Sequence, residues 1–175
     1  MKTTKTVMAG VPRWADRLAR WVPLMTLPSG LWRVALVAGL PIGAVSAGTM
    51  PLWEKGYVLS LSVVSELLAL LTLGLVQPWG ERVPRWVPLL GGRRIPRMAA
   101  VVPAVLGGLA LTLIWEFYAM GVLFLEGGFD NAGFTIAGNV LLVVCYAPLL
   151  AWGPALLAVT WAYYQRRGLR QPVAG

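Results

Sequence analysis

The sequence predicts an all-α integral membrane protein with four transmembrane helices and an N-terminal amphipathic interfacial helix. Of its 175 residues, 58% are hydrophobic and 13% are charged, whereas a soluble domain carries roughly 25% charged residues. Apolar runs of about 20 residues recur along the chain, and that length crosses a hydrocarbon core of about 30 Å. The basic residues lie almost entirely in the N-terminal segment, in the loop 77–97 and in the C-terminal tail.

We expect a single membrane domain over 1–175. Its predicted transmembrane helices are 34–53, 57–76, 98–125 and 134–164; the other parts are a cytoplasmic or interfacial segment 1–33, a basic cytoplasmic loop 77–97 and a cytoplasmic tail 165–175. The last two helices exceed the roughly 20 residues that a span needs, so they tilt, kink or project beyond the bilayer. Pro103, Pro148 and Pro154 are the expected kink sites, because proline removes a helix hydrogen bond.

The N-terminal segment has the pattern of an amphipathic helix. One helical face holds Trp14, Leu18 and Trp21, and another holds Arg13, Arg17 and Arg20. Such a helix lies at the headgroup level of a membrane. The sequence VPRW occurs at 11–14 and 83–86, and WVPL at 21–24 and 86–89. These similarities indicate either a parallel internal repeat or two interfacial segments of like composition.

The distribution of Lys and Arg predicts that both termini lie in the cytoplasm. Six basic residues precede position 34, five lie in 77–97 and three in the tail, whereas Lys55 alone lies on the other side. Because cytoplasmic loops carry such an excess, we expect a multi-pass protein of the cell inner (plasma) membrane. The net charge of +8 then reflects topology, and we expect the lipid bilayer, not a nucleic acid, as a partner. The oligomeric state stays open.

Two residue counts narrow the possible chemistry. The chain has no His and only Cys145, which excludes imidazole catalysis, His-rich metal sites and an intramolecular disulfide relay. It also lacks Asp-rich clusters. We therefore expect no metal site and no cofactor.

Glu66 and Glu116 are the predicted catalytic residues, because each is a carboxylate within a long apolar run. A charged group at membrane depth costs roughly 2.5–3.5 kcal/mol on insertion scales, so it normally faces a protein interior or a cavity. Each glutamate lies nine residues from the outer end of its predicted span, about 13 Å deep at a rise of about 1.5 Å per residue. A carboxyl group removed from water favours its protonated form and can donate a proton.

The predicted substrate-binding residues surround these two acids in the predicted spans. They are Ser62, Thr112, Trp115, Phe117, Tyr118, Asn139 and Tyr146. Ser62 lies one helical turn before Glu66, and Thr112 lies one turn before Glu116. The aromatic rings are included because aromatic faces can stabilise a cation. Other interpretations stay open: Glu66 and Asn139 could join helices by hydrogen bonds, and Glu116 could be solvated near the interface.

Three stretches of the sequence carry a resemblance. LPSGLWR at 27–33, SELLALLTLGLV at 65–76 and PWGERVPRWVPLLGGRRIP at 78–96 resemble a family of small four-span membrane proteins from actinobacteria, over nearly the whole chain. In size and in its lack of Asp-rich motifs, the chain is also similar to the small bacterial membrane-bound terpene cyclases of drimentine-type indole-alkaloid pathways. That second resemblance implies protonation of an isoprenoid and transfers no catalytic residue.

We therefore expect a membrane-embedded terpene cyclase that acts on an apolar prenyl or lipid-like substrate. Glu66 or Glu116 would protonate the prenyl chain, aromatic rings would stabilise the carbocation, and no metal would take part. One alternative is a proton-coupled small-molecule transporter, although the first predicted span contains no acid. Another is a non-catalytic membrane subunit or lipid-binding protein. The sequence leaves the substrate, the product and the identity of the acid open.

Overall fold

The computed structural model describes residues 10–43, 50–80, 92, 95–121 and 134–169. In this part of the chain all regular structure is helical. The elements are α1 (Arg13–Val37), α2 (Leu52–Gly74), the 3-10 turn η1 (Pro78–Gly80), α3 (Arg97–Met120), α4 (Ile136–Leu150) and α5 (Trp152–Leu169).

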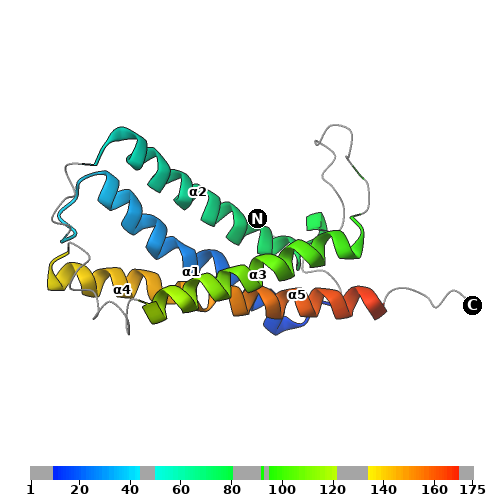
Figure 1. The fold of residues 1–175 in the computed structure, drawn as a ribbon. Helices are drawn as coiled ribbons and strands as arrows, with labels where there is room; N and C mark the ends of the chain where they lie inside the picture. The colour runs from blue at the N-terminus through cyan, green and yellow to red at the C-terminus, as the bar shows by residue number, and fades with distance from the viewer. Residues whose placement is uncertain (1–9, 44–49, 81–91, 93–94, 122–133, 170–175) are drawn as a thin grey trace, which may run out of the picture.

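The helices form four antiparallel rods, because α4 and α5 follow one another almost in line (Figure 1). α1 packs against α2, α4 and α5, and α3 packs mainly against α5. One end of the bundle holds the start of α1, the end of α2, η1, the start of α3 and the end of α5. We call it the basic end, because it carries Arg13, Arg17, Arg20, Arg97, Arg166 and Arg167.

The central position of α1 follows from a stripe of mostly small side chains. Its buried residues are Ala15, Ala19, Val22, Thr26, Ser29, Trp32 and Leu36. They recur every three or four residues, so they share one helical face, and small side chains let neighbouring helices approach closely. The hydroxyls of Thr26 and Ser29 donate to carbonyls within the same helix, at 2.9 Å and 2.8 Å.

The expected first span, 34–53, differs from the structure, in which α1 ends at Val37 and α2 starts at Leu52. The amide of Leu40 donates to Ala35 O at 3.0 Å and that of Gly39 to Leu36 O at 3.1 Å. This hydrogen-bond pair is a Schellman motif. It requires a left-handed residue, which Gly39 supplies with φ 73°.

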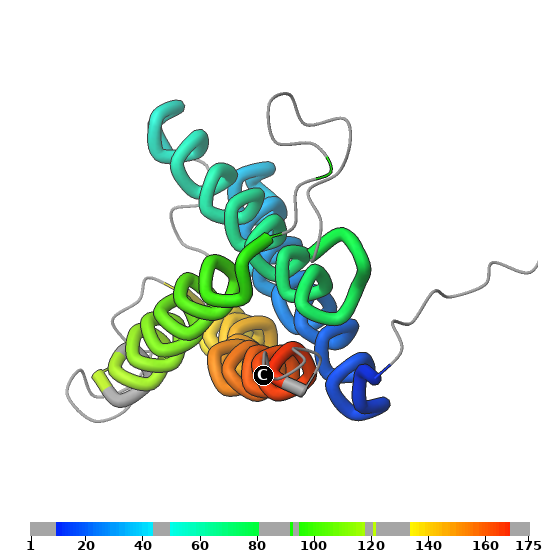
Figure 2. The backbone as a smooth tube through the Cα atoms, turned by 90° about the vertical axis from the view of Figure 1, so that its right-hand side faces the viewer, coloured from blue at the N-terminus to red at the C-terminus, as the bar shows by residue number. Residues whose placement is uncertain are grey.

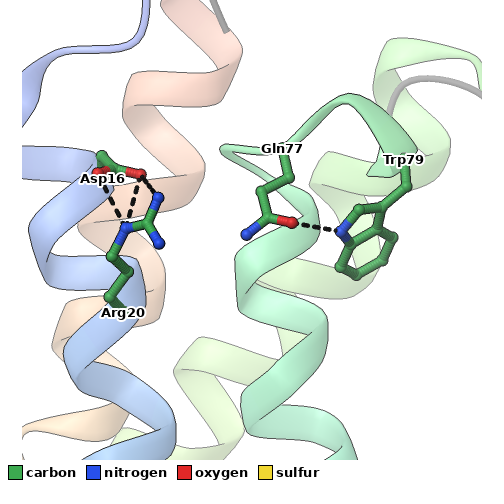
Figure 3. A network of polar contacts seen from close by, with 4 residues as sticks. All are labelled: Asp16, Arg20, Gln77 and Trp79. Atoms are coloured by element: carbon green, nitrogen blue, oxygen red, sulfur yellow. Dashed lines mark hydrogen bonds and ion pairs between the residues drawn. The ribbon is translucent and has the colours of Figure 1, made fainter. Parts of the chain in front are cut away.

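The expected amphipathic segment forms the first turns of α1 and does not end before the bundle. Its Trp14 and Trp21 are exposed, whereas Ala15 and Ala19 beside them are buried in the bundle. Asp16 also lies in these turns and binds Arg20, with a shortest distance of 2.9 Å (Figure 3). A separate interfacial helix is therefore not present among residues 10–43.

The other expected spans differ in detail. α2 starts five residues before the expected 57–76, and α3 covers the start of 98–125, of which 122–125 lie outside the described residues. The segment expected as 134–164 is divided at Ala151 into α4 and α5. Pro148 and Pro154 flank this division, as a helix break by proline requires.

Three helical segments are long and apolar enough to cross a membrane. They are Leu52–Gly74, Arg97–Phe117 and Ile136–Gly168, with mean hydropathy values of 1.8, 2.1 and 2.1. Large apolar side chains such as Leu67, Leu106 and Val144 are exposed on these segments. These features are compatible with a membrane protein.

The contact between α3 and α5 depends on a glycine. A Cβ atom on Gly153 would lie 2.7 Å from the backbone nitrogen of Thr112, which is closer than packed atoms tolerate. The Thr112 hydroxyl donates to Gly108 O on its own helix at 2.8 Å. The two helices therefore meet almost backbone to backbone at this point.

Candidate functional site: an apolar cavity beside an aromatic cluster

A cavity of about 500 Å³ lies between α2, α3 and α5. Its volume is within the range of about 300–1,000 Å³ that ligand pockets occupy. The lining is almost wholly apolar and contains no Asp, Glu, Lys or Arg. The residues are Leu68, Leu71, Thr72 and Gly74 of α2, Leu75 directly after α2, Trp79 and Gly80 of η1, Ile95 before α3, Ala99, Ala100, Pro103, Ala104, Gly107, Ala110, Leu111 and Ile114 of α3, and Trp152 and Leu156 of α5.

The cavity exists because α3 presents small residues to it. Ala100, Ala104 and Gly107 lie on the lining face, at spacings that keep residues on one side of a helix. A Cβ on Gly107 would meet no atom within 4 Å. α2 and α3 approach each other at the basic end and diverge toward the opposite end (Figures 1 and 2).

Trp79 forms the wall of the cavity at the basic end. Its indole Nε1 donates to Gln77 Oε1 at 2.8 Å, as Figure 3 shows. A Cβ on Gly74 would lie 2.8 Å from the Trp79 ring, so this ring packs directly on the α2 backbone. The indole position is therefore fixed both by a hydrogen bond and by a glycine.

Two buried polar atoms belong to residues of this apolar lining. Thr72 on α2 is 1% exposed and Trp152 on α5 is 3% exposed. Within the described part of the chain, neither Thr72 Oγ1 nor Trp152 Nε1 has a hydrogen-bond partner. Buried polar groups are normally paired, so these two atoms are exceptions among the described residues.

An aromatic cluster joins the cavity to the opposite end of the bundle. Tyr146 of α4 contacts Trp32 and Trp115, with ring centroids 5.6 Å and 5.8 Å away, and Trp32 also contacts Phe134 at 5.6 Å. Trp115 and Tyr146 pack against the buried group that contains Trp152. The aromatic cluster and the cavity therefore share a wall.

Arg33 is the functional candidate that sequence analysis missed. Its Nε donates to the Tyr146 hydroxyl at 3.1 Å, and its guanidinium carbon lies 5.3 Å from the centre of that ring. Arg33 Nη1 is buried and has no hydrogen-bond partner among the described residues. The sequence places Arg33 in the predicted cytoplasmic or interfacial segment 1–33. In the structure it lies twenty residues after Arg13 on one continuous helix, about 30 Å further along at about 1.5 Å per residue.

Glu66 faces α1 and does not line the cavity. Its Oε1 is buried without a hydrogen-bond partner in the described structure, and it lies 3.5 Å from the position that a Cβ on Gly30 would occupy. Glu66 is partly buried as a residue.

Glu116 has different surroundings, because it is exposed on α3. The adjacent Phe117 is 73% exposed, and the side chain of Tyr118 lies outside the described residues. α3 has no extensive contact with α1, against which Glu66 lies. The structure therefore brings Trp115 and Tyr146 together but gives the two carboxylates separate environments.

The remaining predicted binding residues lie between packed helices. Ser62 is buried and donates to Val58 O at 3.2 Å, so its proton serves its own helix, like that of Thr112. Asn139 is buried in the first turns of α4. No group of three or more His, Cys, Asp or Glu that could hold a metal ion occurs in the described residues.

Comparisons with known proteins assign no family. No protein-family model, no curated protein and no solved structure matches this chain. Function must therefore be argued from the cavity and its neighbouring side chains.

Proposed function

We propose that this protein binds a prenyl or other long apolar chain within the membrane. The observation that carries the proposal is the cavity of about 500 Å³, which has no charged side chain in its lining. Apolar ligands are held by such surfaces because burial of apolar area is favourable, at roughly 25 cal/mol per Å². A bilayer supplies apolar chains directly to a cavity at membrane depth.

The proposed topology has four membrane crossings, with α1 as the fourth. α1 is 25 residues long, about 37 Å at about 1.5 Å per residue, and it packs antiparallel to α2 (Figure 1). The basic end would face the cytoplasm of the cell's inner membrane, as the positive-inside rule requires. Both termini would then be cytoplasmic, and Arg33 and Lys55 would belong to the outer half.

Ligand entry would occur between α2 and α3, which diverge away from the basic end (Figure 2). Leu68, Leu71 and Ile114 line the cavity on these two helices, and they are exposed and apolar. A ligand could pass from the acyl-chain region into the cavity without crossing a polar surface. Trp79 would close the cavity toward the cytoplasm.

Metal-independent terpene cyclisation is the second candidate. The cluster of Trp32, Trp115 and Tyr146 favours it, because electron-rich faces stabilise a carbocation. Leu111 lines the cavity one helical turn before Trp115, so a bound chain could reach these rings. Glu66 is the better candidate acid because its carboxyl oxygen is buried. No carboxylate lines the cavity, so binding is proposed as the primary function and cyclisation as the second.

Photolabelling of the full chain in lipid nanodiscs tests binding. The probe is a farnesol derivative with a diazirine in its chain, and labelled peptides are identified by mass spectrometry. We expect labels on α2 and α3 residues of the cavity, and we expect Gly107→Leu to remove them, because its side chain would enter open space. Gly56→Leu is the matched control, since Gly56 is equally open but outside the cavity lining. Labels that persist in Gly107→Leu would contradict the proposal.

Product analysis tests the second candidate. The protein is incubated with farnesyl diphosphate, a farnesylated indole and an epoxidised prenyl chain, and the products are separated by mass and retention. A cyclised isomer that disappears in Glu66→Gln and persists in Glu116→Gln would support cyclisation with Glu66 as the acid. Binding to the cavity without any product would leave the protein as a binding protein.

A further inference from the structure

We infer that the ligand of this cavity carries a phosphate group at one end of its apolar chain, and that Arg97 and Arg167 bind this phosphate. The inference deepens the proposed function and rests on it. The observation behind it is that both guanidinium groups lie where the start of α3 meets the last turn of α5, at the basic end of the cavity.

Arg167 of α5 directly contacts a residue of the cavity lining. Its Nη1 donates to Ile95 O at 2.9 Å and to the Tyr163 hydroxyl at 2.6 Å, and Ile95 lines the cavity. Arg167 is half-buried, and none of the enclosed, unpartnered nitrogens of the described structure belongs to it. Because both bonds use Nη1, its other N–H groups are available to an anion.

Arg97 lies two residues after Ile95, in the first turn of α3. Its guanidinium carbon is 3.5 Å from the centre of the Tyr164 ring, and a Cβ on Gly168 would lie 3.2 Å from its Nη2. Tyr164 is 41% exposed, so the guanidinium stacks at the surface of the bundle. Of its three nitrogens, only Nε is enclosed without a partner. A stacked guanidinium keeps the N–H groups at its edge free to bind an anion.

The basic end has a large excess of positive charge. Within the described residues its one acid is Asp16, which binds Arg20 at 2.9 Å. Neither Arg97 nor Arg167 forms an ion pair in this part of the chain. A phosphate fits such a pair of cations, because each guanidinium presents parallel N–H groups that match two phosphate oxygens.

The cavity is open to the surface close to these arginines. Ala99 lines the cavity, is exposed and lies two residues after Arg97. An apolar chain between α2 and α3 could therefore leave the cavity at the first turn of α3, where its end group would meet the two guanidinium groups. The lining itself holds no charged side chain. The phosphate would thus lie outside the cavity, at the level of the lipid headgroups.

Competition against the diazirine probe tests the inference, with the full chain in phosphatidylcholine nanodiscs. Farnesyl monophosphate and farnesol carry the same chain and differ in the phosphate. In the wild-type protein we expect the phosphate to compete roughly 10-fold more strongly, which is the effect of charge-assisted hydrogen bonds. Higher salt should reduce this advantage and leave farnesol unchanged. Inorganic phosphate alone should not compete.

Substitutions attribute the advantage to the arginines. Arg97→Gln should lower it to roughly 2- to 3-fold and leave competition by farnesol unchanged, and Arg167→Gln should act in the same direction. Arg97→Lys keeps the charge without the planar fork, so we expect an intermediate value. Arg17→Gln is the matched control, because Arg17 lies at the basic end but is exposed on α1, outside the cavity lining. Competition by farnesol shows in each variant that the cavity is still folded.

Phosphatidic acid distinguishes two sources of the phosphate, because it carries the same group on two acyl chains. Stronger competition by phosphatidic acid than by farnesyl monophosphate would assign the site to an acyl lipid. Weaker competition would assign it to a prenyl phosphate. Either result supports the phosphate site.

The outcomes separate this inference from the proposal on which it rests. Equal competition by farnesol and farnesyl monophosphate would overturn the phosphate site, and so would equal effects of Arg97→Gln and Arg17→Gln. Apolar binding would still stand in both cases. Absence of cavity labelling, with no competition by farnesol, would remove the proposed function itself.

Discussion

Arg33 of α1 donates a hydrogen bond from Nε to the hydroxyl of Tyr146 on α4, at 3.1 Å and across 113 positions of sequence. The same guanidinium lies 5.3 Å from the centre of the Tyr146 ring. Tyr146 is in turn held between Trp32 and Trp115. One tyrosine thus connects a cation to the aromatic cluster beside the cavity, and it fixes the position of α4 relative to α1.

Tyr146→Phe tests the hydrogen bond and keeps the ring contacts. The variant leaves Arg33 Nε without this acceptor, so we expect the free energy of unfolding to fall by about 1–2 kcal/mol. Thermal unfolding in a fixed detergent measures the change. Tyr146→Leu, which also removes the ring contacts, should be less stable still. Equal stability of Tyr146→Phe and the wild type would contradict a stabilising Arg33–Tyr146 bond.

Arg167 should stabilise the basic end of the bundle. Its Nη1 donates to Ile95 O at 2.9 Å and to the Tyr163 hydroxyl at 2.6 Å, so it ties the end of α5 to the residues before α3. Arg167→Met retains much of the apolar stem and removes both bonds. We expect a loss of roughly 1–3 kcal/mol, measured by chemical or thermal unfolding, whereas Arg17→Met at an exposed position should have almost no effect.

Gly153→Val should separate α3 from α5. The new side chain would overlap the Thr112 backbone, and overpacking of this kind costs typically about 1–3 kcal/mol. Gly107→Ala is the counterpart on α3, where a Cβ meets open space. Because alanine also favours helix more than glycine, Gly107→Ala should unfold at the same temperature as wild type or higher. The reverse order of stabilities would contradict the described packing.

The proposed topology can be tested with single cysteines. In a Cys145→Ala background, Lys55→Cys should react with a membrane-impermeant maleimide in intact cells. Arg17→Cys, at the basic end, should react only after the membrane is permeabilised. Protection of Lys55→Cys, or labelling of Arg17→Cys in intact cells, would reverse the orientation derived from the positive-inside rule.

Much of the fold could be predicted because an apolar run of about 20 residues indicates a membrane-spanning helix. The apolar runs correspond to α2, α3 and the α4–α5 segment, and the prolines at 148 and 154 flank the observed break. The wrong prediction was the first span, expected over 34–53, where α1 ends at Val37. Glycine followed by proline, as at Gly39 and Pro41, is a known signal of a helix end. The mean hydropathy stays high across these residues because they are uncharged, so the predicted span continued through them.

The site was harder to predict because it depends on helix rotation. Apolar runs have little periodicity, so the sequence did not reveal that Glu66 faces α1. For Glu116 it left a buried and a solvated position both open, and the structure shows the exposed one. Trp115 and Tyr146 were predicted as substrate-binding residues, and their rings are in contact in the structure. Thr72 and Trp152 gave no signal, since an unpaired hydroxyl or indole can be recognised only when its surroundings are known. Arg33 was assigned to the cytoplasmic or interfacial segment 1–33 because the first span was predicted to start at position 34.

The small residues of α3 have a consequence for how this protein can diversify. α3 packs on α5 and also lines the cavity. A Cβ added at Gly107 would meet no atom within 4 Å, so the space available to a ligand can be altered at Gly107 without changing the contact with α5. Each added methyl group would shorten the space available to a ligand. Selectivity for ligand size could then evolve by substitutions on α3 alone, while the packing of the other helices stays the same.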